Sequence, residues 1–334
     1  MHRQILGETG FQLGFGCVRL TVHPRQVEAV AILEHAFSLG ITHFDVARSY
    51  GFGRAESILG KFLRGRRDQV TIASKFGLQP PSGLAGNHRL INAAKRLLAP
   101  FPGLLRRTQR LGGAMGKTGV FAPEAAIQSL ETSLRELGTD YLDLLLLHEA
   151  TLADAASEPL LEALDKQVAK GAVRHIGVAS DFSKIAENAG SLPARYEVVQ
   201  FNDNAWSRNL PKLAGRAQRL LITHSAFAPA GMLRRAAQAY PQITAESSRQ
   251  IDADLRDSAT IASLLLHYAL RSNANGIILF SSIDPIHIEA NVKEARSQRF
   301  DDVQVEQFAA FVDKVLSASG QTAAGLRDAS QAIA

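Results

Sequence analysis

The sequence has little cysteine and no long apolar run. Cys17 is the only cysteine among 334 residues, so no internal disulfide can form and a reducing compartment is favoured. Residues 1–10 hold no apolar stretch of signal-peptide length, and the longest apolar runs, at 144–147 and 262–266, are too short to cross a bilayer. These absences predict a soluble, cytoplasmic protein that does not enter a membrane.

Acidic residues are absent between Asp68 and Glu124. Residues 77–122 contain seven of the 37 basic residues and none of the 32 acidic ones, so the rest of the chain carries 30 basic against 32 acidic side chains. The seven are Arg89, Lys95, Arg96, Arg106, Arg107, Arg110 and Lys117. The basic excess therefore belongs to one segment, and we expect no general nucleic-acid binding.

Eight short apolar runs follow one another along the chain. Most are rich in Val, Ile and Leu without strict alternation, which is typical of parallel strands covered on both faces. They occupy residues 11–18, 41–47, 69–76, 141–148, 173–180, 196–202, 219–227 and 275–281.

Amphipathic segments separate these runs. Pro24 and Pro123 suit a first helical turn, and Gly40, Gly138 and Gly171 suit the position after a helix. The segments occupy residues 24–40, 54–63, 123–138, 158–171 and 258–272. Strand-then-helix repeats without internal sequence repetition predict an α/β fold of the (β/α)₈ TIM-barrel type, forming one domain over residues 1–320.

Two regions lie outside the eight repeats. Residues 77–122 form a long, Pro- and Gly-containing insertion after the third strand, which we expect to be lid-like because loops of this size are usually functional or disordered. Residues 321–334 are mostly small and predict a flexible tail.

Four polar residues follow strand ends, where barrel chemistry takes place. Asp45 ends the second predicted strand and Tyr50 lies in its loop, while Lys75 and His148 end the third and fourth. Taken singly, each has an ordinary structural explanation, such as a turn-capping acid or a solvated lysine. Their convergence on one mouth of the barrel favours a catalytic site.

The motifs that carry these residues resemble those of the aldo-keto reductase family. They are GITHFDVARSYGFGRAESILGKFL, TIASKFG, TDYLDLLLLH and RHIGVAS, in that order. RQILGETGFQLGFG is similar to the family's N-terminal β-hairpin, and the resemblance extends to IEANV at 288–292. It implies an NAD(P)(H)-dependent oxidoreductase that reduces an aldehyde, ketone or sugar carbonyl, or oxidises the matching alcohol, without a metal.

The four residues suit that chemistry. Hydride addition to a carbonyl creates an alkoxide, which needs a proton and an electrostatic partner. A Lys75 ammonium about 4 Å from the Tyr50 oxygen would favour the phenolate by roughly 4 kcal/mol, or about three pKa units before desolvation is subtracted. Asp45 would hold Lys75 charged, and His148 would hydrogen-bond the carbonyl oxygen. The resemblance assigns the same roles.

No G-x-G-x-x-G motif follows a strand, so a Rossmann-type dinucleotide site is not predicted. The resemblance instead implies cofactor contacts from strand ends and loops, although ordinary turn chemistry explains many of them equally well. Outside the last loop, these residues are Gly16, Cys17, Ser180, Asp181, Gln200, His224, Ser225 and Gly231. His224 stands where the family usually has an aromatic side chain that stacks on the nicotinamide.

The loop after the last strand bears on the choice between NAD and NADP. A 2′-phosphate is best bound by Arg or Lys, whereas a free ribose hydroxyl tolerates a carboxylate. The residues that match the family's pattern there are Ser281, Ser282, Asp284, His287 and Asn291, with His287 in place of a frequent arginine. NADP, NAD and dual use therefore stay open.

The substrate is a small-molecule carbonyl or sugar whose identity the sequence leaves open, as it does the oligomeric state. Cys17, Val18 and Glu149 lie on loops that could line the pocket, although Cys17 also suits a buried apolar position. Two alternatives to an enzyme stay open. One is a cofactor-sensing regulatory barrel with little turnover, and the other is a partner-docking or membrane-surface role for the basic residues of 77–122.

We predict little discrimination between the two reduced cofactors, because residues 276–292 contain no Lys or Arg that could bind a 2′-phosphate. Fluorescence titration of NADH and NADPH measures both affinities. An NADPH preference above about 100-fold, worth roughly 2.7 kcal/mol, would contradict the prediction and require a basic residue from elsewhere.

Overall fold

A computed structural model describes residues 12–22, 26–78, 119–185, 190–213 and 219–320. In this part of the chain, eight parallel strands close into a barrel in chain order, which confirms the predicted fold and all eight strands. The predicted tail and residues 3–11 of the predicted N-terminal hairpin lie outside the described ranges. The strands are β1 (Leu13–Gly16), β2 (His43–Asp45), β3 (Thr71–Phe76), β4 (Leu142–His148), β5 (Val173–Ala179), β6 (Val198–Asn202), β7 (Leu220–His224) and β8 (Ile277–Phe280).

Pairing between β1 and β8 closes the barrel. Phe15 of β1 lies opposite Phe280 of β8, and Gly16 lies opposite Asp45 of β2. At the β5–β6 contact, a Cβ atom on Gly177 would lie 2.3 Å from the carbonyl oxygen of Val198. Glycine there lets the two strand backbones approach each other.

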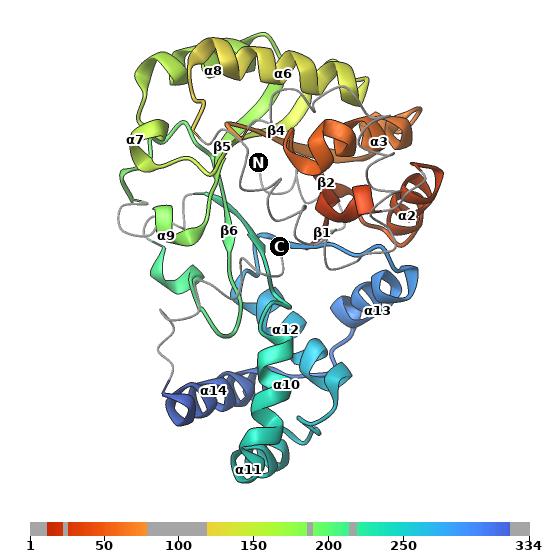
Figure 1. Ribbon diagram of the computed structural model, residues 1–334, viewed down its shortest axis with the longest axis vertical. Coiled ribbons are helices and arrows are strands. Elements are labelled where there is room, and N and C mark those ends of the chain that lie inside the picture. Colours follow the sequence, from red (N-terminus) through yellow and green to blue (C-terminus); the bar gives the residue numbers. More distant parts are fainter. Residues whose placement is uncertain (1–11, 23–25, 79–118, 186–189, 214–218, 321–334) are drawn as a thin grey trace, which may run out of the picture.

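All five predicted helices are present. They are α2 (Gln26–Ser38), α3 (Arg54–Leu63), α6 (Pro123–Leu137), α8 (Glu158–Ala169) and α12 (Ser258–Ser272). Pro123 is the first residue of α6, and Gly138 ends that helix in the left-handed conformation at φ 65°. Pro24, predicted to open the first helix, lies outside the described residues. α6 and α8 cover one side of the barrel (Figure 1).

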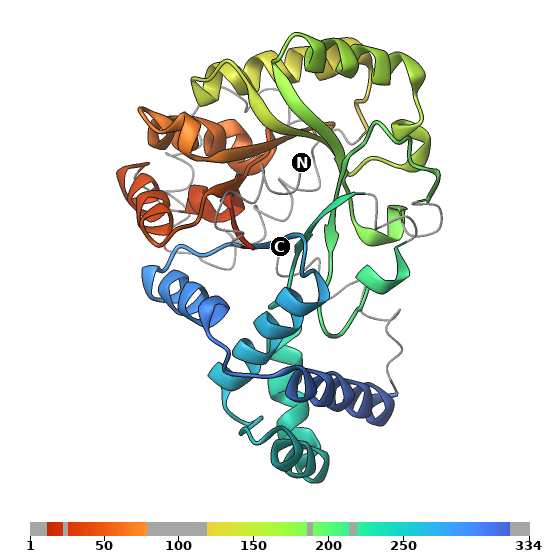
Figure 2. The same ribbon diagram turned by 180° about the vertical axis from the view of Figure 1, so that it is seen from behind.

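The alternation of strands and helices is less regular than the sequence predicted. The described residues between β5 and β6 include only the four-residue α9 (Phe182–Ile185), and those between β6 and β7 only a 3-10 turn. Extra helices follow instead near the C-terminus and at the fourth strand: α7 (Leu152–Ala155), α10 (Ala230–Ala239), α11 (Pro241–Ile251), α13 (Pro285–Arg296) and α14 (Asp302–Ser319). Figures 1 and 2 show α10, α11 and α14 beside the barrel, in the lower part of each view.

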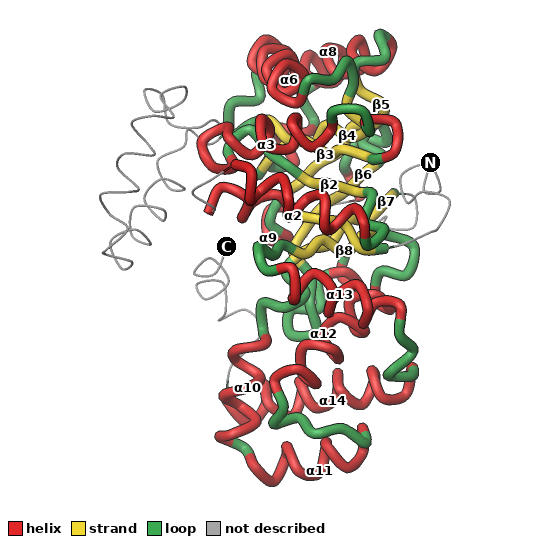
Figure 3. Tube along the Cα trace, turned by 90° about the vertical axis from the view of Figure 1, so that its right-hand side faces the viewer, coloured by secondary structure: helices red, strands yellow, loops and turns green. Residues whose placement is uncertain are grey.

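Separate apolar clusters support these layers. The barrel interior is filled by small and branched side chains from six strands: Ala73, Leu144, Leu146, Ala179, Val198, Leu220, Ile222, Ile277 and Leu279. A second cluster joins α10, α11, α12 and α14, with Phe308 and Phe311 fully buried. Figure 3 shows these helices as a layer below the strands. This additional core explains why the chain continues past its eighth strand.

A charged cluster closes the end of the barrel where the strands begin. Asp143, the second residue of β4, is only 2% exposed. It accepts hydrogen bonds from Arg67 Nη2 at 2.8 Å and Arg174 Nη1 at 2.7 Å. The backbone N–H of Ile72 donates to it as well, at 2.9 Å. Both guanidinium groups also lie over the Tyr141 ring, 3.8 and 4.2 Å from its centroid. The carboxylate thus ties β3, β4 and β5 together.

We predict that Asp143→Asn lowers the free energy of unfolding by about 3 kcal/mol, because it removes a buried charge and leaves Arg67, whose side chain is only 16% exposed, without its counter-charge. Urea unfolding followed by circular dichroism measures the change. The matched control is Glu34→Gln, which removes a partly exposed partner 3.5 Å from Arg66 and should cost less than about 1 kcal/mol. A loss below about 1 kcal/mol for Asp143→Asn would contradict the prediction.

Candidate active site

The structure brings the four predicted catalytic residues together at the mouth formed by the C-terminal strand ends. Lys75 lies in β3, and its Nζ donates to Asp45 Oδ1 at 2.5 Å and to the Val46 carbonyl at 3.2 Å. The same Nζ lies 3.3 Å from the Tyr50 hydroxyl. Asp45 and Lys75 are about 2% exposed. A continuous polar chain therefore runs from Asp45 through Lys75 to Tyr50.

His148 completes the group from the end of β4. Its ring meets that of Tyr50 edge to face, with centroids 5.9 Å apart and planes at 84°. Its Nδ1 is buried and has no hydrogen-bond partner among the described residues. The His148 imidazole thus lies directly beside the Tyr50 ring.

Gly51 shapes the turn that carries Tyr50. The Tyr50 N–H donates to the Ala47 carbonyl at 3.0 Å, and Tyr50 begins a 3-10 turn, Tyr50–Gly53. Gly51 has φ 56°, and a Cβ atom on it would lie 2.1 Å from the Thr21 side chain. The turn can pack this closely on Thr21 only because the residue after Tyr50 is glycine.

Burial governs the protonation of Tyr50 and Lys75. Burial raises the pKa of Tyr50 above its ordinary value, and the opposing effect of Lys75 does not cancel it. Lys75 lowers the pKa as expected, but desolvation of the phenolate, which that expectation left out, is the larger effect. Burial disfavours the Lys75 ammonium, yet the neighbouring Asp45 and Tyr50 raise its pKa overall. The pair is thus set as a protonated phenol beside an ammonium.

The histidines of the site are neutral. Burial, then Lys75, His224 and Lys184, hold the pKa of His148 well below its usual value. Burial and Lys75 lower the pKa of His224 to about 4. A neutral imidazole donates one N–H and accepts at its other nitrogen, so His148 can orient a carbonyl or hydroxyl oxygen without adding charge.

Cys17 lies beside these groups, but its thiol is unreactive. It is fully buried, and burial together with Asp45 raises the pKa of its thiol well above the ordinary value. Its Sγ lies 3.9 Å from the Phe15 carbonyl. Because the thiolate is the reactive form, Cys17 acts here as a small apolar side chain.

The residues predicted to hold a nicotinamide lie at the ends of neighbouring strands, but only one has an unused polar atom. Gln200 of β6 is 4% exposed, and its Oε1 has no partner within the described residues. Ser180 donates to the Ala150 carbonyl at 2.8 Å, and Asp181 accepts from Ser183. A buried orphan acceptor is costly, so Gln200 fits a ligand that supplies an N–H, such as a carboxamide.

Three further predicted contacts follow β7. His224 ends the strand, and its Nδ1 lies 2.8 Å from the Ser225 hydroxyl. Ser225 has φ 69°, a conformation rare for residues other than glycine. Gly231 lies in the first turn of α10, with only Arg235 near its Cβ position. These residues occupy the mouth side of the barrel, where the dinucleotide was predicted to lie.

Residues of the loop after β8 mainly cap the N-terminus of α13. Asp284 accepts from the Ile286 N–H as the N-cap, and Ser282 accepts from the Asp284 N–H. Ser281 has a buried hydroxyl without a partner among the residues described, and lies near Gly16 at the end of β1. His287 is exposed and Asn291 is half-buried in α13. Of these residues, Ser281 offers the free polar atom that a bound phosphate or ribose would use.

Four residues at the mouth were not singled out from the sequence. Glu56 of α3 is fully buried and bonds Arg48 and Ser74, which flank Tyr50 and Lys75 in the chain. Lys184 pairs with Glu149 at 2.8 Å beside His148. Arg48 and Glu56 lie within the Tyr50 motif, but a glutamate in the first turn of an amphipathic helix predicts a solvated side chain. Its burial became visible only with the fold.

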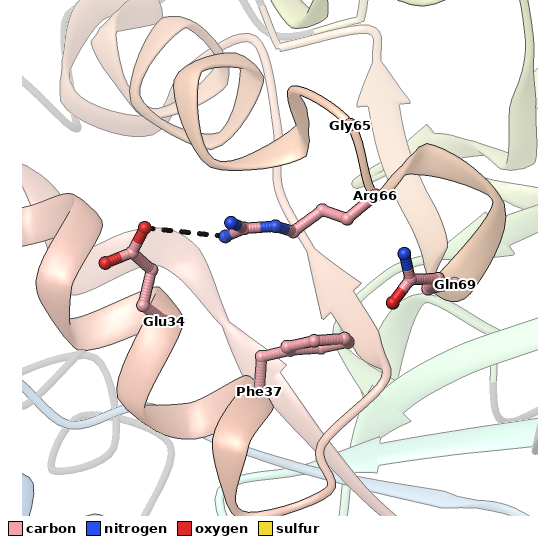
Figure 4. Close-up of a pocket in the computed structure, with 5 residues that line it drawn as sticks. All are labelled: Glu34, Phe37, Gly65, Arg66 and Gln69. Carbon is pink, nitrogen blue, oxygen red and sulfur yellow. Dashed lines mark hydrogen bonds and ion pairs between the residues drawn. The ribbon is translucent and has the colours of Figure 1, made fainter.

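A hollow bounded by described residues lies away from the predicted catalytic group. Glu34 and Phe37 of α2, with Gly65, Arg66 and Gln69 before β3, line a space of about 420 Å³ (Figure 4). Arg66 reaches across it toward Glu34. These positions belong to the end of the barrel where β3 begins, opposite to the mouth that holds Tyr50.

Most of the basic insertion, residues 79–118, lies outside the described ranges.

Among the described residues, no helix is long and apolar enough to pass through a bilayer. No group of three or more His, Cys, Asp or Glu side chains there is arranged to hold a metal ion.

Comparison with known proteins identifies relatives over most of the fold. The model of the aldo/keto reductase family matches residues 12–313. The aldo-keto reductase yakc [NADP(+)] of Schizosaccharomyces pombe is 30% identical over 198 residues, covering 57% of this chain and 48% of that protein. The 6-dehydroglucose reductase of Agrobacterium fabrum is 34% identical over 168 residues, covering 48% and 46%. The alignments thus span about half the length of these relatives.

A solved structure shares the fold. The Klebsiella pneumoniae aldo-keto reductase in complex with NADPH superposes with a TM-score of 0.61 at 22% identity, covering 91% of this chain and 90% of that one. At this identity the likeness extends to the barrel architecture.

Buried histidines predict a loss of stability in acid. Burial and Lys75 lower the pKa of His43 to about 3, and its Nδ1 bonds the Thr71 hydroxyl at 2.9 Å. Below pH 6.5 the unfolded chain gains a proton there that the folded chain lacks, so stability falls by up to about 1.4 kcal/mol per pH unit until about pH 3. We expect His43→Gln to show a shallower loss between pH 6 and 4 in urea unfolding. An unchanged slope would mean that His43 is already protonated in the folded protein.

Proposed function

Because the chain belongs to the aldo/keto reductase family, we propose that it is an NAD(P)(H)-dependent oxidoreductase. It reduces an aldehyde, ketone or sugar carbonyl, or oxidises the matching alcohol, with Tyr50 as general acid and base. The observation that carries the proposal is the buried chain from Asp45 through Lys75 to the Tyr50 hydroxyl, with His148 beside it. A buried chain of this kind at a strand-end mouth is suited to moving a proton to or from a bound substrate.

The bound nicotinamide would supply hydride to the carbonyl carbon, or accept it from the alcohol. In the reducing direction, the carbonyl oxygen gains negative charge and takes the Tyr50 hydroxyl proton. Lys75, 3.3 Å away, stabilises the phenolate that remains, and Asp45 holds Lys75 charged. In the oxidising direction the phenolate takes the alcohol proton. Each direction returns the proton that the other uses.

His148 orients the substrate oxygen. It is neutral because burial lowers its pKa, and its Nδ1 is unpaired in the described part of the chain. A neutral donor can hold the oxygen toward Tyr50 without competing as the stronger acid. The pKa of His148 is lowered and that of Tyr50 is raised, so His148 orients the oxygen as a neutral donor and Tyr50 supplies the proton.

Cofactor and substrate class draw support from the relatives. Their names include an NADP(+)-dependent enzyme and a reductase of 6-dehydroglucose. Gln200 and Ser281 would hold the cofactor, since their buried polar atoms are otherwise unpaired among described residues. We therefore favour NAD(P)H and a carbonyl of aldehyde or sugar type.

We predict that Tyr50→Phe lowers carbonyl reduction by about 10²- to 10⁴-fold, because it removes the general acid and little else. The assay follows NADH and NADPH oxidation with sugars, aldehydes, ketones and quinones. Tyr240→Phe, a half-buried tyrosine between α10 and α11, is the matched control and should keep full activity. If Tyr50→Phe retains more than half of the rate under chemistry-limited conditions, the assignment of Tyr50 is wrong. If no carbonyl is reduced at all by the intact protein, a cofactor-sensing role replaces the proposal.

A further inference from the structure

Glu56 joins the two segments that carry Tyr50 and Lys75. It lies in the first turn of α3 and is fully buried. Its Oε2 accepts from Arg48 Nη1 at 2.6 Å, and its Oε1 accepts from the Ser74 hydroxyl at 2.7 Å. Each carboxylate oxygen therefore has a separate partner on a separate segment.

Both partners are close in sequence to the reacting pair. Arg48 precedes Tyr50 by two residues in the loop after β2, and Ser74 directly precedes Lys75 in β3. Because side chains alternate along a strand, Ser74 faces α3 while Lys75 faces the barrel mouth. Glu56 thus connects the turn of Tyr50 to the strand of Lys75 from behind the site.

We propose that Glu56 is a positioning residue that sets the distance between the Tyr50 hydroxyl and Lys75 Nζ, 3.3 Å in the structure. The proposal rests on the proposed function, in which this distance determines how strongly Lys75 stabilises the phenolate. The Tyr50 turn needs such an anchor because it is short and contains two glycines at positive φ, Gly51 and Gly53. The Arg48 guanidinium lies 3.7 Å from the Cβ position of Gly53, so the anchor also packs on the turn.

Glu56 acts on Tyr50 by fixing the position of the turn and not through its own charge. Besides burial, the groups that shift the pKa of Tyr50 are Lys75, Asp45 and Cys17. The Glu56 charge is matched by Arg48 at 2.6 Å, with Arg48 only 17% exposed. Neutralising Glu56 would leave Arg48 buried without its counter-charge, and the turn would relax away from β3.

Burial raises the pKa of Tyr50, and the Lys75 ammonium lowers it. A longer distance between the two groups weakens this lowering, so the pKa of Tyr50 rises further. Alcohol oxidation needs the phenolate, and its rate should therefore rise at higher pH than in the unmodified enzyme. Carbonyl reduction should slow because Tyr50 becomes a weaker acid. Cofactor affinity should not change, since Glu56 lies outside the predicted cofactor contacts.

The experiment compares pH profiles of kcat for alcohol oxidation in the unmodified enzyme, Glu56→Gln and Ser74→Ala. For Glu56→Gln we expect kcat to fall by about 10- to 100-fold and the midpoint of the profile to rise by about half a unit to one unit. Ser74→Ala removes one of the two hydrogen bonds and should shift both quantities in the same direction by less. The KM for NAD⁺ and NADP⁺, the cofactors that the oxidation consumes, should stay within about 2-fold in both variants.

Asp143→Asn is the structural control. It also removes a buried, arginine-paired carboxylate, but at the opposite end of the barrel. It should lower stability and leave the pH midpoint in place. The proposal is overturned if Glu56→Gln moves the midpoint no more than Asp143→Asn does. If Glu56→Gln does not fold, the shift in Ser74→Ala decides. An active Tyr50→Phe in the same assay would instead defeat the proposed function.

Discussion

The buried ammonium of Lys75 is the constraint on which the rest of the site depends. A charge inside a barrel wall is costly unless it is paired and hydrogen-bonded. Asp45, the Val46 carbonyl and the Tyr50 hydroxyl meet that requirement together, and all three come from β2 and the loop that follows it. The parallel pairing of β2 with β3 is what places them there, since Asp45 lies opposite Ala73 in the register. The contacts that place these groups for the proposed reaction therefore also make the burial of Lys75 possible.

The two ends of the barrel solve similar electrostatic problems for different purposes. At the end where the strands begin, Asp143 is surrounded by two arginines and a backbone donor, so its charge is fully matched. At the mouth, buried polar atoms of His148, Gln200 and Ser281 lack partners within the described ranges. The matched charge of Asp143 holds strands together, whereas the unpaired polar atoms at the mouth could bond a ligand.

Burial outweighs pairwise attraction in setting protonation states at the mouth. It raises the pKa of Tyr50 and lowers those of His148 and His224, so each group is held in its neutral form. Lys75 is the exception, because two neighbours raise its pKa against burial. A cation that is held by Asp45 and faces neutral donors suits a reaction in which negative charge develops on a single oxygen.

The sequence by itself determined the barrel, its eight strands and the grouping of Asp45, Tyr50, Lys75 and His148. Strands buried on both faces leave continuous Val, Ile and Leu runs, and residues that end successive parallel strands must meet at one mouth. Only the tertiary structure decided the helical layer of α10, α11 and α14, the net direction of the Tyr50 pKa and the burial of Glu56. Helix packing, desolvation and the pairing of Glu56 with Ser74 depend on segments that are separated in the chain. A pattern within one segment therefore does not specify which other segment it packs against.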